Sequence, residues 1–262
     1  MFYPLIKSWQ PFAAVIVIAI FWSWESFRPF LKIPYPRVKH GLINVIISLI
    51  NGVLITFVFS GVTVLAADYS IVNSFGMLYN LSLPEILQWI AAFILLDAWN
   101  YWWHRINHLV PFFWRFHRMH HSDPNMDVTT ATRFHFGEII ISSIIRLPVI
   151  FFIGIPIWTL IIYDFILLLN TLFHHSNISI SKPADKKLRY FIVSPFMHKV
   201  HHSRIQSETD SNYSSFCTLW DRIFGSYRER DDYENIKFGL DNFYSEDDQS
   251  LTGLIKTPLF KK

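Results

Sequence analysis

Histidines gather in three tight clusters, each near the end of a long apolar segment. The chain contains 12 histidines, and ten of them belong to these clusters or lie near them as single residues. The clusters, followed by the two single residues, are His104 and His108; His117, His120 and His121; His198, His201 and His202; and His135 and His175. Each helical residue turns its side chain by about 100°, so histidines at positions i, i+3 and i+4 project from one helix face. This spacing predicts a metal site.

The second and third clusters are two copies of one pattern, HxxHH. The copies begin at His117 and His198. Each copy can offer three imidazoles to one metal, or to two metals that share a site. Neutral ring nitrogens suit iron, zinc or copper. His40 and His174 do not belong to this pattern, and we interpret them as hydrogen-bonded structural residues.

The composition is typical of an integral membrane protein. The chain is 52% hydrophobic and 18% aromatic, with a mean hydropathy of +0.27, and these values exceed ordinary globular usage. The formal net charge is only +3, and Lys and Arg gather in particular loops, which argues against nucleic-acid binding. Cys217 is the single cysteine, so a disulfide framework and a thiolate zinc ribbon are excluded. Any metal must rest on imidazole, carboxylate or water.

Five apolar stretches organise the chain, at 11–24, 41–67, 86–103, 139–153 and 156–173. We expect the first three to cross roughly 30 Å of hydrocarbon as helices. The last two are joined through Gly154 and Pro156 into a hairpin that either crosses twice or only dips into the bilayer. The first stretch is interpreted as an anchor, because it lacks the small-residue cleavage pattern of a signal peptide. The expected fold is all-α, an integral membrane bundle of about four transmembrane helices.

Charged loops predict the orientation. The loop between the first two stretches contains Arg28, Lys32, Arg37 and Lys39, whereas the next loop, 68–83, contains no Lys or Arg. The first loop is therefore expected to be cytoplasmic. Counting crossings from it places every histidine cluster on the cytoplasmic side. Both a bacterial inner membrane and the endoplasmic reticulum fit this multi-pass topology.

The chain is expected to form one functional unit with four successive parts. These are N-terminal transmembrane helices (1–103), a first histidine cap segment (104–138), a transmembrane or re-entrant hairpin (139–173), and a C-terminal histidine cap segment with a tail (174–262). Together the two cap segments are expected to form a cytoplasmic helical cap that carries a two-metal site.

Polar residues inside the apolar helices are candidates to support the histidines. A metal-binding imidazole usually donates its other N–H to a carboxylate, carbonyl or water. Asp97 lies seven residues before His104 and Asp164 lies eleven before His175, so each shares a helix face with that histidine. Arg146 either pairs with Asp164 or extends toward the membrane surface. Weaker candidates, equally compatible with solvated or capping roles, are Asp123, Asp127, Glu138, Asn212 and Asp221.

Six motifs between Leu96 and Tyr227 resemble, in this order, the fatty acid hydroxylase and sterol desaturase superfamily of membrane non-haem di-iron enzymes. They are HRINH, WRFHRMHHS, RFHFGE, HSN, SPFMHKVHHS and NYSSFCTLWDRIFGSY. The resemblance implies a cap on a small transmembrane bundle, and it favours His175 over His174 and a supporting role for Asn212. It also implies ten iron ligands, which are His104, His108, His117, His120, His121, His135, His175, His198, His201 and His202.

The same resemblance implies hydroxylation, or the related desaturation, of a fatty acyl chain or sterol. The cofactors would be two iron ions, Fe2+ or Fe3+, with O2 as co-substrate. Ten imidazoles shared by two irons give about five per metal and leave an open position on each. The sequence contains no Gly-rich dinucleotide fingerprint and no cysteine set for an iron–sulfur cluster, so a separate ferredoxin, cytochrome or reductase is expected. Basic residues near the clusters that could dock an acidic donor are Arg115, Arg118, Lys199 and Arg204.

Two other functions fit parts of the sequence. A dizinc membrane hydrolase is possible, because zinc accepts imidazole ligands and activates water. A metal transporter or sensor ranks last, because the histidines lie at one face of the membrane instead of through the spans. The sequence does not indicate the oligomeric state.

Overall fold

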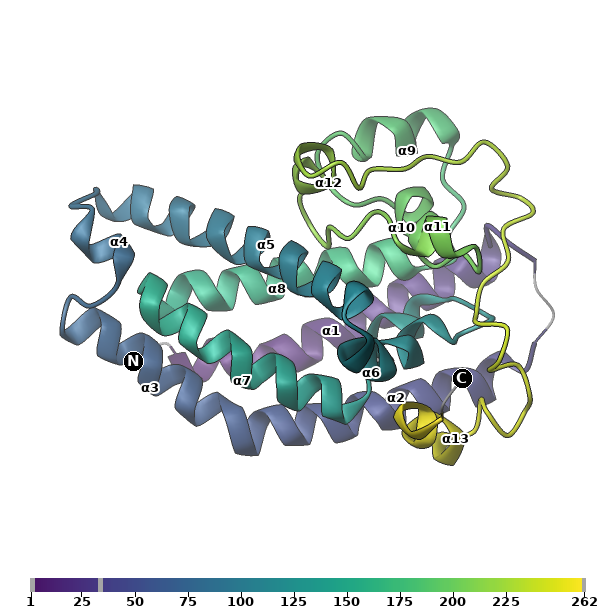
Figure 1. Cartoon of the computed structure of the whole chain (residues 1–262), viewed down its shortest axis with the longest axis horizontal. Coiled ribbons are helices and arrows are strands. Elements are labelled where there is room, and N and C mark those ends of the chain that lie inside the picture. The colour runs from purple at the N-terminus through teal and green to yellow at the C-terminus, as the bar shows by residue number, and fades with distance from the viewer. Residues whose placement is uncertain (1–2, 33–34, 261–262) are drawn as a thin grey trace.

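The chain is built from helices (Figure 1), which confirms the all-α prediction. The computed structural model describes residues 3–32 and 35–260, with side chains described from Phe12 onward. The elements are α1 (Tyr3–Phe27), α2 (Arg37–Leu54), the π-helical turn η1 (Ile55–Phe59), α3 (Ser60–Val72), α4 (Met77–Asn80), α5 (Glu85–Leu109), α6 (Pro111–His121), η2 (Val128–Thr132), α7 (Phe136–Ile153), α8 (Ile157–His175), α9 (Lys182–Leu188), α10 (Pro195–His201), α11 (Gln206–Thr209), α12 (Leu219–Ile223), α13 (Leu251–Lys256) and η3 (Thr257–Leu259).

Long apolar helices form the bundle. Among the described residues, three helical segments are long and apolar enough to cross a membrane, namely Arg37–Asn80, Phe136–Ile153 and Ile157–His175. They indicate a multi-pass membrane protein. The predicted third stretch, 86–103, is helical within α5 but is not one of these segments, because Gln88, Asp97 and Asn100 interrupt its apolar sequence. The first stretch lies in a shorter apolar helix, Phe12–Phe27.

The predicted hairpin is present as α7 and α8. Gly154 ends α7 in the left-handed conformation, with φ at 76°, and Pro156 precedes the first residue of α8. A Cβ atom on Gly76 would lie 2.5 Å from the Cα of Gly154, so the loop before α4 packs directly on this turn. Below the turn, Leu96, Ile150 and other buried residues of α3, α5, α7 and α8 form the largest apolar cluster. The hairpin is thus fixed at its tip by contact between two glycines.

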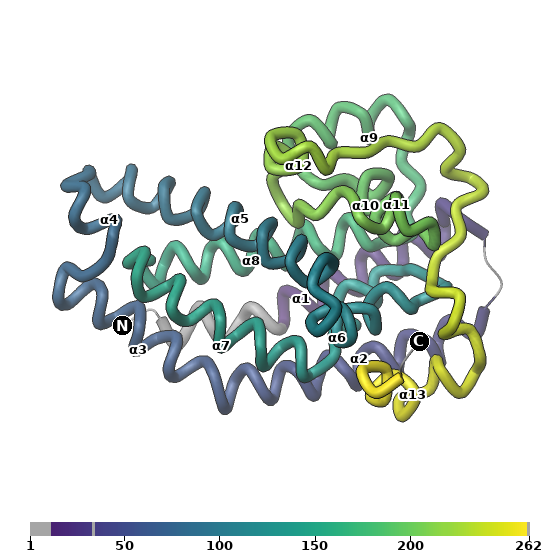
Figure 2. The backbone as a smooth tube through the Cα atoms, in the orientation of Figure 1, coloured from purple at the N-terminus to yellow at the C-terminus, as the bar shows by residue number. Residues whose placement is uncertain are grey.

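Shorter helices gather at the opposite end of the bundle, where α9 to α12 form a layer above α8 (Figure 1). The chain then crosses this layer and returns to the bundle, so that α13 lies beside α2 (Figure 2). Leu254 of α13 packs with Ile47 of α2 and Met119 of α6. The last part of the chain is therefore anchored against the helix that carries the first HxxHH motif.

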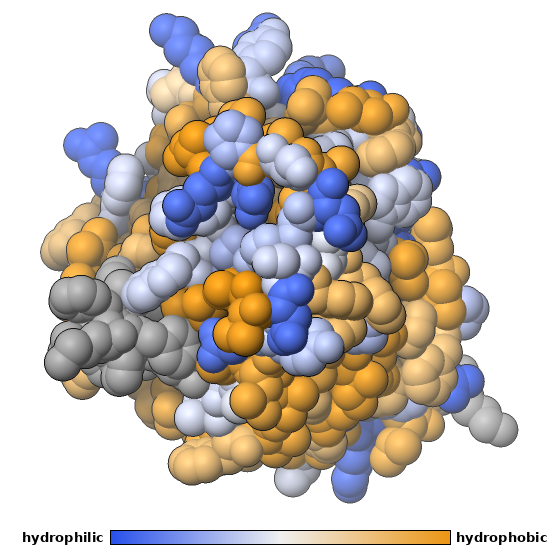
Figure 3. Space-filling view, turned by 90° about the vertical axis from the view of Figure 1, so that its left-hand side faces the viewer, coloured by the Kyte–Doolittle hydropathy of each residue, from blue (hydrophilic) through white to orange (hydrophobic). Residues whose placement is uncertain are grey.

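Figure 3 looks onto the other end of the bundle, where α3 and α4 lie. Hydrophilic side chains are interspersed with hydrophobic ones across the upper half of this face, and hydrophobic side chains cover most of the lower half. The two groups of histidines that could bind metal lie toward the opposite end of the bundle, so the length of the bundle separates them from this surface.

Candidate metal centre

Nine of the ten predicted ligands converge in two groups. Group one consists of His104, His108, His117, His121 and His201, and group two consists of His120, His175, His198 and His202. In each group the candidate ligand nitrogens lie within 4.8 Å of one another. All nine are buried except His104, which is partly exposed. Residues 97 positions apart in the sequence, His104 and His201, thus meet in one group.

The two HxxHH motifs are divided between the groups in opposite ways. In α6, His117 and His121 belong to group one and His120 belongs to group two. In the α10 motif, His201 belongs to group one, whereas His198 and His202 belong to group two. Positions i and i+4 share a helix face, and position i+3 lies to one side of it. Each short helix therefore serves both groups.

Backbone carbonyls and one carboxylate orient four of the rings. The Nδ1 atoms of His104, His201 and His175 donate to the carbonyls of Tyr213 at 2.7 Å, Ser211 at 2.7 Å and Thr171 at 2.8 Å. The Nδ1 of His117 donates to Oε1 of Glu138 at 2.8 Å. In a neutral imidazole these bonds place the proton on Nδ1, so the lone pair of Nε2 is free to bind a metal.

The Nε2 atoms face one another at short distances. The Nε2 of His175 lies 3.0 Å from those of both His120 and His198, and the Nε2 atoms of His104 and His201 are 3.1 Å apart. Two nitrogens bound about 2.1 Å from one metal lie about 3.0 Å apart at a right angle and about 3.4 Å apart at the tetrahedral angle. The residues present therefore fit a metal ion in each group.

Burial lowers the pKa of most of these imidazoles and so favours their neutral form. Desolvation, followed by the neighbouring histidines, lowers the pKa of His120 and of His198 well below the ordinary value. Desolvation also lowers the pKa of His201 to about 3. Both ring nitrogens of His121 are buried without a hydrogen-bond partner among the described residues, as is the Nε2 of His117. Buried nitrogens without a hydrogen-bond partner are available to bind a metal.

His135 is placed apart from both groups, contrary to the ligand role implied by the resemblance. Its Nδ1 accepts from the backbone N–H of Gly137 at 2.9 Å, which caps the first turn of α7. Its Nε2 donates to the carbonyl of Ile255 at 3.0 Å. Since both ring nitrogens are engaged, His135 has no lone pair left for a metal.

Asp97 and Asp164 do not reach the histidines that share their helix faces. Asp97 accepts from the Nε1 of Trp220 at 2.7 Å, from the N–H of Cys217 at 3.1 Å and from the hydroxyl of Tyr163 at 3.2 Å. Asp97 thus holds the 217–220 segment against α5 and α8. Seven helical residues span about 10 Å and eleven about 16 Å, so a shared face alone does not bring the side chains into contact.

Asp164 pairs with Arg146 instead, at 2.5 Å and 3.3 Å. This pairing was one of two outcomes that the sequence left open for Arg146.

Asn212 supports the site through the backbone. It has a left-handed conformation, with φ at 53°, and its side chain donates to the carbonyls of Met197 and Arg228. The next residue, Tyr213, presents the carbonyl that orients His104. Asp221 fixes the same loop by accepting from the N–H groups of Tyr213 and Ser214. These carbonyl partners were missed by sequence reasoning, because no side-chain pattern marks them.

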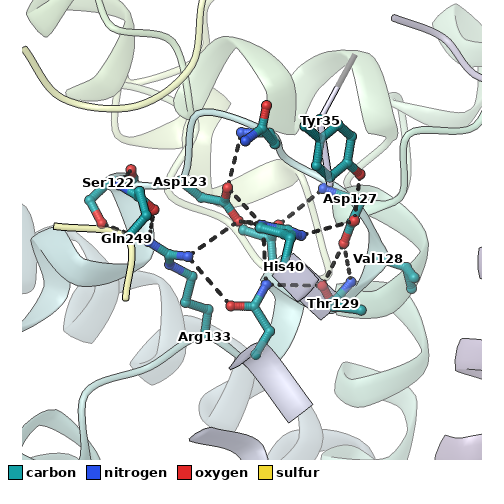
Figure 4. Close-up of polar contacts among 12 residues, drawn as sticks. Tyr35, His40, Ser122, Asp123, Asp127, Val128, Thr129, Arg133 and Gln249 are labelled. Atoms are coloured by element: carbon teal, nitrogen blue, oxygen red, sulfur yellow. Dashed lines mark hydrogen bonds and ion pairs between the residues drawn. The ribbon is translucent and has the colours of Figure 1, made fainter. Parts of the chain in front are cut away.

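A second polar network holds the C-terminal end of α6 (Figure 4). The Nε2 of His40 lies 2.9 Å from a carboxylate oxygen of Asp123, and Arg133 donates to the carbonyl of Met119 and to Gln249. Burial alone would raise the pKa of Asp123, but the charges of His40 and Arg133 hold it below its usual range. His40 is therefore a structural residue, as expected. His174 lies beside group two, with its ring centroid 3.9 Å from that of His198.

A cavity of about 300 Å³ connects the two groups to the bundle. His104 and His117 of group one line it, together with His120, His175 and His198 of group two. The rest of its wall comes mainly from α5, α7 and α8. A molecule in this cavity would contact both groups at one end and the membrane helices at the other.

The family described as fatty acid hydroxylase matches residues 89–226, which is more than half of the chain. The chain belongs to the fatty acid hydroxylase family. The match confirms the resemblance read from the histidine motifs. It spans α5 to α12 and so includes both HxxHH motifs and Glu138.

Three relatives show the range of the fatty acid hydroxylase family around this chain. The alkylglycerol monooxygenase of Homo sapiens is 31% identical over 62% of this chain and 35% of its own length. The ornithine lipid hydroxylase of Rhizobium tropici is 27% identical over 55% of this chain and 43% of its own length. The methylsterol monooxygenase 1-3 of Arabidopsis thaliana is 26% identical over 85% of this chain and 75% of its own length.

The chain spans between about a third and a half of the length of the vertebrate alkylglycerol monooxygenases that it matches. No solved structure matches it.

Proposed function

We propose that this chain is a membrane di-iron oxygenase that hydroxylates, or desaturates, a lipid with O2 and external electrons. One observation carries the proposal: histidines from two largely buried groups line one cavity that continues between the long helices of the bundle. Relatives named as monooxygenases and hydroxylases of alkylglycerol, ornithine lipid and methylsterol support a lipid substrate.

Iron is favoured over zinc by the number of histidines in each group. Structural and catalytic zinc sites prefer tetrahedral coordination with three or four protein ligands. Five histidines in group one and four in group two suit six-coordinate iron with positions left for other ligands.

When bound, the iron pair would supply the redox chemistry with O2, placing one oxygen atom on the lipid and releasing the other as water. The protein's own contribution is to hold and orient. Glu138 and the carbonyls of Tyr213 and Ser211 keep the Nε2 atoms of three rings turned inward. The apolar helices around the cavity exclude bulk water, which protects a reactive centre from side reactions.

The electron donor is proposed to dock on the cap, which we place on the cytoplasmic side from the charge of the loops. Two of the four basic residues suggested by the sequence do not fit that role. Lys199 is fully buried and donates to the carbonyl of Ser176, and Arg118 is buried and donates to the carbonyl of Thr257. Arg115 is exposed and remains a candidate.

The test is metal content combined with lipid oxidation. Purified protein should contain iron, and with a reductant and O2 it should add one oxygen to a lipid, or remove two hydrogens, as detected by mass spectrometry. Zinc in place of iron, with oxygen-independent hydrolysis of a lipid, would support a dizinc hydrolase and contradict the oxygenase.

A further inference from the structure

Four uncharged polar side chains line the cavity just below the histidines. They are Asn100 of α5, Ser142 and Ser143 of α7, and Thr171 of α8, and we call them the polar ring. Each is partly buried, as expected for a side chain that faces a cavity. Polar groups at this depth are costly unless they have a partner.

Three residues of the ring lie at one depth in the bundle, because each is one helical turn from a residue of the metal site. Asn100 is four residues before His104, Thr171 is four before His175, and Ser142 is four after Glu138. Helices α5 and α8 run toward the histidines and α7 runs away from them, so all three offsets lead into the bundle. One helical turn of about 5.4 Å separates the ring from the ligand layer.

The ring has unused hydrogen-bonding capacity. Within the described part of the chain, the side chains of Asn100, Ser143 and Thr171 make no hydrogen bond. Ser142 accepts from the Nε1 of Trp103 at 2.8 Å, which leaves its own hydroxyl proton to donate. The ring therefore offers several donors and acceptors from three helices to whatever occupies the cavity.

The ring itself carries no charge. Arg146, one turn deeper on α7, is the only Arg or Lys side chain among the described residues that line the cavity, and it is paired bidentately with Asp164. On the other side, Oε2 of Glu138 is buried without a partner among the described residues. No Arg or Lys side chain of the cavity wall is therefore free to pair with a carboxylate or phosphate at the ring. The uncharged donors and acceptors of the ring match a neutral oxygen.

We propose that the polar ring binds a hydroxyl or ether oxygen of the substrate, so that the enzyme selects lipids with a neutral oxygen a few bonds from the oxidised carbon. This inference rests on the proposed function and deepens it, because it restricts the substrate class. A plain alkyl chain leaves the ring unsatisfied and is expected to bind more weakly.

The test is a binding comparison on the iron-loaded protein in detergent. Two probe pairs are used: a glycerol lipid with an ether-linked alkyl chain against its analogue with a methylene in place of the ether oxygen, and a hydroxyl-bearing sterol against its deoxy analogue. Affinities are measured by displacement of a radiolabelled lipid. In at least one pair the oxygen-bearing lipid should bind roughly tenfold more tightly, as one satisfied hydrogen bond predicts.

Substitutions in the polar ring test which of its residues produce the preference for the oxygen-bearing lipid. Thr171→Val and Asn100→Leu keep the approximate volume and remove the polar groups, so each should reduce the preference of that pair toward one. Thr159→Val is the matched control, because it makes the same change on α8 at a hydroxyl that lies outside this cavity. It should leave the preference unchanged.

Equal wild-type affinity for both members of both pairs would overturn the proposal. So would variants that weaken both members of a pair equally, since the ring would then only fill space or hold water. Oxidation of a lipid is measured on the same preparations. A binding preference without oxidation would refute the oxygenase and keep the ring, whereas oxidation without a preference would refute the ring alone.

Discussion

The Nε2 atoms of His104 and His201 lie 3.1 Å apart with no proton to share. The Nδ1 of each imidazole donates a hydrogen bond to a backbone carbonyl. Burial lowers the pKa of His201 to about 3, which favours its neutral form. Two lone pairs facing each other at this distance repel unless a cation lies between them. The carbonyls of Tyr213 and Ser211 thus impose a metal-binding arrangement on histidines from two distant segments.

Replacing a histidine of either group should remove activity without preventing folding. His120→Ala and His201→Ala are each expected to abolish lipid oxidation and lower the iron content, because each removes a convergent nitrogen. Iron per chain is measured by elemental mass spectrometry on protein extracted from membranes. His135→Ala is the control and should keep its iron. Wild-type iron and turnover in His120→Ala would contradict the site.

Glu138 should matter for metal retention more than for stability. Its carboxylate orients His117, and loss of such a partner typically costs 10 to 100-fold in metal affinity, roughly. Glu138→Ala is expected to show this loss in a titration with a competing chelator. Glu138→Gln keeps an acceptor oxygen and should lose less. Identical affinities for the two variants and the wild type would show that His117 is held by other contacts.

Asp97→Ala should destabilise the fold because it leaves three donors without an acceptor. These belong to Tyr163, Cys217 and Trp220. The expected loss is about 1 to 3 kcal/mol per unsatisfied buried group, and it should appear as a lower unfolding temperature in detergent. Folded protein should retain iron, since Asp97 bonds no histidine in the described chain. A selective loss of iron at an unchanged unfolding temperature would restore the direct supporting role that the sequence suggested.

The turn between α7 and α8 should tolerate no side chain at Gly154. Its φ of 76° and the carbonyl of Phe75, 2.7 Å from an added Cβ, predict a loss of at least about 1 to 2 kcal/mol for Gly154→Ala. Gly61→Ala is the matched control, because an added Cβ there has no neighbour within 4 Å. Thermal unfolding of both variants tests this. Equal unfolding temperatures would mean that the turn rearranges freely.

Metal-free protein should lose stability as the pH falls. The folded pKa of His201 is about 3, below the ordinary value of 6.5, so the unfolded chain binds more protons between these values. Metal-free protein is therefore expected to lose stability as the pH falls from about 6.5 toward 3. Unfolding is followed by tryptophan fluorescence across this range, with metal-loaded protein as the reference. A flat profile for the metal-free protein would show that the histidines are solvated when metal is absent.

Local spacing in the sequence predicted much of the centre. The i, i+3, i+4 pattern predicted His117, His120 and His121 on one face of a helix, and the structure places all three in α6 at the two histidine groups. It did not predict how the three are shared, because that depends on how α6 and α10 pack. Nor did it predict the carbonyl of Tyr213, whose direction is set by Asp221 across a loop. Helical periodicity predicted Asp97 on the face of His104, but it did not predict the partners of Asp97, which are Tyr163, Cys217 and Trp220.

Because α6 and α10 each serve both histidine groups, we expect loading of the two proposed metal sites to be coupled. A metal in one group would fix the tilt of both short helices and so preorganise the other group. We therefore expect cooperative filling, with few molecules holding a single ion. When iron is limiting, the protein is then expected to divide between molecules that hold both ions and molecules that hold none.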